Sequence, residues 1–124
     1  MTNDIKKLIS TTEQATKDFT EFTMYIAYNY GGQWDIINAV KSALSNNDSI
    51  AHDTLSHYLS TGNDFPDLIV RTGGYKRLSN FMLWQAVYSE LEFLDILWPD
   101  ISRRDIELIF EQYTDIKRNF GTVK

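Results

Sequence analysis

The sequence contains no cysteine and only two prolines among its 124 residues. Without cysteine the chain forms no disulfide, performs no thiol catalysis and offers no cysteine-ligated metal site. No run of about 18 apolar residues occurs, so we expect no transmembrane span. Residues 1–10 are polar and lack the apolar core of a signal peptide. These absences leave the compartment open, and a cytoplasmic location is our expectation.

Basic residues are also scarce, with 12 Lys and Arg against 17 Asp and Glu and a formal net charge of −5. This balance argues against nucleic acid as the main partner. Apolar residues are abundant, because 43% of the residues are hydrophobic and 14% are aromatic. That content is typical of a folded globular chain, and the length suits one domain, residues 1–124.

Hydrophobic periodicity predicts helices that alternate with short strands. The expected helices are 4–19, 33–44, 50–60, 81–88 and one from 102 onward, and the expected strands are 23–28, 68–71 and 91–97. Such alternation indicates an α/β fold with about three parallel strands flanked by helices. A sheet this small has two open edges, so we expect a further polypeptide to cover at least one of them.

The helices carry predicted inner faces and one predicted cap. The first helix is expected to pack its stripe into the core, namely Ile5, Leu8, Ile9, Thr12, Ala15 and Phe19. The second would bury Trp34, Ile37, Val40, Ala43 and Leu44. The last begins with Ser102 and Asp105 as a capping box. Its stripe would be Ile106, Ile109, Phe110, Tyr113, Ile116 and Phe120.

Residues 71–80, RTGGYKRLSN, carry the densest set of chemically useful side chains. They combine three basic residues, a glycine pair and two residues suited to capping a following helix: Arg71, Lys76, Arg77, Gly73, Gly74, Ser79 and Asn80. Adjacent glycines let the backbone turn tightly and expose N–H groups. A strand, a glycine turn, guanidinium groups and a helix N-terminus together predict a phosphate site. The alternative from physics alone is an ordinary strand-to-helix turn with solvated charges.

Residues 71–100, RTGGYKRLSNFMLWQAVYSELEFLDILWPD, closely resemble the C-terminal signature of the cis-prenyltransferases, the undecaprenyl diphosphate synthase family. Residues 26–40, IAYNYGGQWDIINAV, also resemble the family, with Gln33 where arginine is usual. The resemblance implies half of the family's fold, a partial three-layer sandwich. The family's other half carries the aspartate of an MDGNGRW-type motif, and no such string occurs here. Asp35, Asp64 and Asp67 do not stand in a matching context.

The resemblance also implies roles for particular residues, with no catalytic residue in this chain itself. The implied diphosphate-binding residues for isopentenyl diphosphate are Arg71, Gly73, Gly74, Arg77, Leu78 and Ser79. Glu90 matches a glutamate that family enzymes contribute to a Mg²⁺ site across a dimer interface, as suits a hard cation. Tyr75 and Lys76 depart from the family pattern, in which glutamate and a polar residue are usual. Asn119 replaces the usual basic residue near the end, and the adjacent Arg118 is a candidate substitute.

The function implied is one subunit of a split cis-prenyltransferase, which condenses isopentenyl diphosphate with an allylic diphosphate when a partner supplies the missing half. The alternatives are a non-catalytic partner of a complete synthase and a truncated, inactive fragment. Membrane association is expected only through the lipid product. His52 and His57 are five residues apart, about 140° around a helix, so we expect surface histidines and no metal site.

Overall fold

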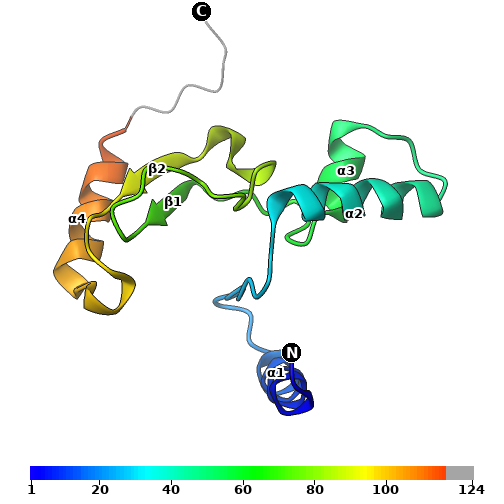
Figure 1. Cartoon of the computed structure of the whole chain (residues 1–124), viewed down its shortest axis with the longest axis horizontal. Helices are drawn as coiled ribbons and strands as arrows, with labels where there is room; N and C mark the ends of the chain where they lie inside the picture. Colours follow the sequence, from blue (N-terminus) through cyan, green and yellow to red (C-terminus); the bar gives the residue numbers. More distant parts are fainter. Residues whose placement is uncertain (117–124) are drawn as a thin grey trace, which may run out of the picture.

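The computed structural model describes residues 1–116 (Figure 1). Phe120, Arg118 and Asn119, on which sequence expectations fell, lie outside the described residues. The described chain forms three groups: α1 (Asn3–Thr16) by itself, α2 (Gly32–Ser45) with α3 (His52–Tyr58), and the strands with α4 (Arg103–Thr114). No helix in residues 1–116 combines the length and the apolarity that a membrane crossing needs.

The sheet has two strands in the described chain, where three were expected. β1 (Leu68–Arg71) and β2 (Glu90–Phe93) pair in parallel, with Leu68 opposite Glu90 and Arg71 opposite Phe93. The α/β class is therefore confirmed, and both of these strands lie where sequence patterning placed them, although β2 is shorter than 91–97. Ile69 of β1 and Ile109 of α4 are buried, and α4 lies beside the sheet in Figure 1.

The expected strand at 23–28 is not formed. The segment lies outside the two-stranded sheet, and its side chains are exposed, with Met24 at 70% and Ile26 at 79%. A strand exists only through hydrogen bonds to a neighbouring backbone. No neighbour in the described chain provides them, so a β-prone sequence remains without a ladder.

The expected helix at 81–88 is also wrong. Ser79, Asn80 and Met82 have positive φ values of 49°, 66° and 46°, which interrupt any helix before it starts. Only a short 3₁₀ turn, η1 (Gln85–Tyr88), follows, and a second one, η2 (Trp98–Asp100), comes after β2. Within 81–88 the one buried residue is Gln85, whereas the large apolar side chains of Phe81, Leu83, Val87 and Tyr88 are exposed.

Two helices present faces that differ from those expected. α1 buries no residue, and Leu8 of its apolar stripe is 66% exposed. The buried side of α2 is Gly32, Asp35, Ala39 and Ala43, while Trp34, Ile37 and Leu44 are exposed. Since α2 packs closely on α3 and on residues near 83, small residues face those neighbours and large ones face outward.

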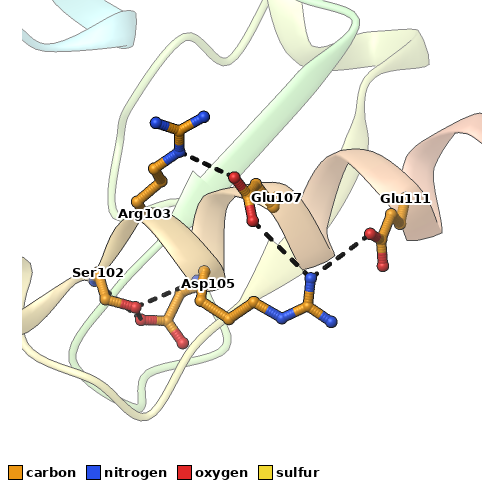
Figure 2. A network of polar contacts seen from close by, with 6 residues as sticks. Ser102, Arg103, Asp105, Glu107 and Glu111 are labelled. Carbon is orange, nitrogen blue, oxygen red and sulfur yellow. Dashed lines mark hydrogen bonds and ion pairs between the residues drawn. The ribbon is translucent and has the colours of Figure 1, made fainter.

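The N-terminus of α4 follows the sequence expectation. The Asp105 N–H donates to Ser102 Oγ at 3.3 Å, and the Ser102 N–H donates to Asp105 Oδ2 at 2.8 Å (Figure 2). Hydrogen bonds from Ser102 lower the pKa of the Asp105 carboxyl below its ordinary value. On the exposed side, Arg103 pairs with Glu107 at 2.8 Å. Of the predicted inner stripe, Ile109 is buried and Phe110 is exposed.

Candidate functional site

A groove of about 320 Å³ lies at the carboxyl end of β1. Its lining residues are Ile69, Val70, Arg71, Thr72, Arg77, Leu78 and Phe81. Ligands in open α/β sheets bind outside the carboxyl ends of parallel strands, because loops there converge around exposed backbone. Three of the residues that sequence reasoning assigned to a phosphate site, Arg71, Arg77 and Leu78, therefore share one concave surface.

Arg71 joins β1 to the far end of the loop. Its Nη1 donates to Ser79 Oγ at 2.8 Å and to the backbone oxygen of Arg77. Ser79 reaches this position with a left-handed backbone, φ 49°. Since the Ser79 oxygen accepts from Arg71, its own O–H remains able to donate to an anion. The structure thus brings Arg71, Arg77 and Ser79 together.

The glycine pair closes the loop in a way that differs from expectation. Gly73 and Gly74 have φ values of 88° and 77°, which favour glycine. Their N–H groups are not exposed, because they donate to the carbonyls of Ile96 and Leu94, each at 2.9 Å. The pair therefore anchors the loop to the chain leaving β2, and the amides do not point at a ligand.

Tyr75 lies beside both guanidinium groups. The Arg77 Cζ is 4.3 Å from the Tyr75 ring centroid, and the Arg71 Cζ is 5.9 Å from it. The ion pairs within residues 1–116 involve none of Arg71, Lys76 and Arg77. The groove therefore keeps a net positive character in a chain that is acidic as a whole.

Asn80 caps a helix, but a different one from the helix expected. Its backbone oxygen accepts from the Gly32 N–H at 2.6 Å, and its Oδ1 accepts from the Gln33 N–H at 2.9 Å. These are N–H groups of the first turn of α2, which have no partner within their own helix. The residue after Ser79 is thus tied to α2, across 47 positions of sequence.

A buried carboxylate lies behind this contact, and sequence reasoning missed its role. Asp35 is 2% exposed. Its Oδ1 accepts from the Ser60 N–H at 2.9 Å and the Ser60 hydroxyl at 2.7 Å. Its Oδ2 accepts from Tyr30 Oη at 2.9 Å and Gln85 Nε2 at 3.0 Å. The sequence signal was its spacing of four and eight residues from the small, buried Ala39 and Ala43.

The pKa values of this cluster follow from its hydrogen bonds. Burial alone would raise the pKa of Asp35, but the bonds from Ser60, Gln85 and Tyr30 outweigh it and lower the pKa below the ordinary value. Burial, together with the bond to Asp35, raises the pKa of Tyr30 to about 12. Asp35 is therefore an ionised anchor and Tyr30 a neutral donor near neutral pH.

Glu90 is not brought to the groove. It lies at the start of β2, opposite Leu68, three residues before the level of Arg71. That offset is about 10 Å along a strand. No group of three or more His, Asp or Glu side chains in residues 1–116 is arranged to hold a metal ion. Glu90 would therefore supply a single carboxylate to a Mg²⁺ ion held mainly by other residues.

The two histidines contact different neighbours. The His52 ring stacks on Trp84 with centroids 5.4 Å apart, and the His57 ring meets Tyr58 edge-on at 5.7 Å. Trp84 also donates to Ser56 Oγ at 3.1 Å. His52 and Trp84 thus help to join α3 to the irregular segment before η1.

Fold and groove together define an α/β protein with a cationic groove at the carboxyl end of a parallel strand. The family profile described as "Putative undecaprenyl diphosphate synthase" matches residues 1–121. The chain therefore belongs to the undecaprenyl diphosphate synthase family, the cis-prenyltransferases, as the motif at 71–100 implied.

Individual relatives agree with this assignment. A ditrans,polycis-undecaprenyl-diphosphate synthase of Buchnera aphidicola subsp. Acyrthosiphon pisum is 44% identical over 120 residues, covering 90% of this chain and 48% of the relative. An isoprenyl transferase of Fusobacterium nucleatum is 42% identical over 123 residues, covering 97% and 53%. The chain thus spans about half the length of these curated relatives.

Solved structures give the same result for the fold. A probable undecaprenyl diphosphate synthase from Campylobacter jejuni superposes with a TM-score of 0.91 at 30% identity, covering 98% of this chain and 58% of that one. Lavandulyl diphosphate synthase from Lavandula x intermedia, solved with dimethylallyl diphosphate, gives a TM-score of 0.90 at 28% identity, covering 98% and 56%. The described elements therefore form part of the family's fold.

Proposed function

We propose that this chain is one subunit of a split cis-prenyltransferase and contributes the groove that binds isopentenyl diphosphate. The observation that carries the proposal is that Arg71 and Arg77 line one groove, with the Ser79 hydroxyl held next to it by its hydrogen bond from Arg71. Guanidinium groups bind phosphate oxygens in two-point fashion, and a hydroxyl adds a further short hydrogen bond. A diphosphate is the small anion best suited to two such cations side by side.

The apolar part of the groove fits the remainder of that substrate. Ile69, Val70, Leu78 and Phe81 line the groove together with the arginines. Isopentenyl diphosphate has a short hydrocarbon tail, which these side chains would shield from water. The arginines on one side of the groove and the apolar side chains on the other would orient the substrate, so that its reactive double bond is directed away from the arginines.

The reaction itself requires groups that this sequence does not contain. The aspartate-bearing half of the family enzymes would come from a second polypeptide, together with the allylic diphosphate site. When bound, Mg²⁺ would neutralise charge that develops on the departing diphosphate. Glu90 would offer one carboxylate ligand to it from the β2 end, away from this chain's own groove.

The test is reconstitution with a companion polypeptide that carries the aspartate-motif half of a family enzyme. We expect Mg²⁺-dependent elongation from the pair and none from either chain alone. Arg77→Ala should lower kcat/KM for isopentenyl diphosphate by about 100-fold or more, because a charge-assisted contact to the phosphate is lost. Arg103→Ala is the matched control, since its partner Glu107 lies on the exposed face of α4.

The outcomes separate this function from the alternatives. If Arg77→Ala leaves turnover of the pair intact, the chain is a non-catalytic partner. If the pair makes no product and the chain binds no inorganic pyrophosphate, the proposal is wrong.

A further inference from the structure

Tyr75 has no role in the substrate contacts proposed above, yet it is the neighbour shared by both arginines of the groove. Its ring centroid is 4.3 Å from the Arg77 Cζ and 5.9 Å from the Arg71 Cζ, and its side chain is otherwise exposed. The distances fall within the range in which a guanidinium group is attracted to the face of an aromatic ring.

The two arginines are held by different means. Arg71 is fixed by hydrogen bonds to Ser79 Oγ and the Arg77 backbone oxygen. Arg77 makes no ion pair with a carboxylate of residues 1–116, so the Tyr75 ring is the contact that orients its guanidinium. A carboxylate in that place would neutralise the charge and occupy N–H donors, whereas a ring face does neither.

We propose that Tyr75 is a positioning residue of the groove: its ring holds the Arg77 guanidinium over the loop with its charge intact and its N–H donors directed to a diphosphate. This inference rests on the proposed function of the groove. It assigns to Tyr75 the pre-ordering of a long, flexible side chain, which otherwise loses rotamer freedom when the ligand binds.

The test is calorimetric titration of the full chain with inorganic pyrophosphate. Tyr75→Leu, which removes the ring, should weaken binding about three- to tenfold, the usual range for an exposed or partly shielded cation–π contact. Tyr75→Phe keeps the ring and should bind within about twofold of the parent chain. Phe110→Leu replaces an exposed aromatic residue on α4 and serves as the control.

A second measurement reports the contact itself. The Nε–Hε proton resonance of Arg77 can be assigned because it disappears from the spectrum of Arg77→Lys. The ring current of residue 75 should shift this resonance upfield in the parent chain and in Tyr75→Phe. It should return to the ordinary position in Tyr75→Leu. Equal pyrophosphate binding by the parent chain and Tyr75→Leu, or an unshifted resonance, overturns the role of Tyr75 alone. A parent chain that binds no pyrophosphate overturns the proposed function and this inference with it.

Discussion

Asp35 has a partner for each of its oxygens although it is 2% exposed. The partners come from three places: Tyr30 before α2, Ser60 after α3, and Gln85 at the start of η1. A buried charge is tolerated when it is fully hydrogen-bonded and becomes costly when a partner is lost. This carboxylate therefore stabilises the junction of α2, α3 and η1 and does not serve as a base in the groove.

Asp35→Asn should lower the free energy of unfolding by about 1–3 kcal/mol. The new amide nitrogen would face donors, the Tyr30 hydroxyl or the Gln85 amide, where an oxygen accepted before. Because the folded pKa of Asp35 lies below its ordinary value, its stabilisation is present above about pH 4 and is lost as the pH falls through the folded pKa. The variant should lose less stability in that range than the parent chain.

Urea unfolding at pH 7 and at steps down to about pH 2 checks both parts. Asp53→Asn is the control, because Asp53 is fully exposed beside His52 and should change stability by no more than about 0.5 kcal/mol. Equal stability of Asp35→Asn and the parent chain at pH 7 would contradict the anchoring role.

Elements that depend on neighbours in sequence were predictable, and those that depend on distant backbone were not. The Ser102 cap of α4 could be predicted because its partner, Asp105, lies three residues away. β1 follows from its short apolar run and the glycine turn after it. The helix expected at 81–88 failed because Asn80 is held by the first turn of α2, 47 positions earlier. No local pattern encodes that contact.

In the candidate site, too, the residue types could be predicted from the sequence, whereas the contacts that depend on distant backbone could not. The residue types of 71–80 predicted an anion site, and the structure places Arg71, Arg77 and Ser79 together. The glycine amides were expected to face a ligand, but they bond to Ile96 and Leu94, because the chain leaving β2 returns beside the loop. The stacking of Tyr75 on Arg77 likewise depends on loop conformation, which residue types alone do not determine.

Gly32→Ala should destabilise the chain by about 1–3 kcal/mol and loosen the groove. A Cβ at Gly32 would lie 2.8 Å from Leu83 Cγ and 2.9 Å from the Leu83 backbone nitrogen. To relieve that overlap, α2 would have to move away from residues 80–83. This movement would weaken the hydrogen bonds by which Asn80 caps α2, and Asn80 is adjacent to Ser79. Thermal melting measures the first effect and pyrophosphate titration the second. Gln33→Ala, at the adjacent and exposed position, serves as the control and should change neither the melting temperature nor pyrophosphate binding. If Gly32→Ala also leaves both unchanged, the close packing of Gly32 against Leu83 is not required.

The whole molecule exposes far more surface than a compact monomer of its mass. Its accessible surface is 10167 Å², whereas a folded monomer of 14.4 kDa exposes about 6,800 Å². Large apolar side chains are among the exposed groups, including Phe22, Met24 and Ile26 of the segment that lies outside the sheet. Large exposed apolar surfaces indicate interaction sites. The chain covers 58% of the Campylobacter jejuni structure that it matches, so a partner that supplies the remaining elements would have this surface to cover.

If a companion half completes the sheet, the backbone of 23–28 should gain a neighbour. Hydrogen exchange of the free chain should then be fast at 23–28, where no ladder exists, and slower by at least about tenfold in the active pair. The amides of α2, which are already hydrogen-bonded in the free chain, provide the internal control. Exchange at 23–28 that stays fast in a pair with full prenyltransferase activity would mean that the companion binds elsewhere, most simply over α1. Protection without activity would instead support a partner whose role is structural.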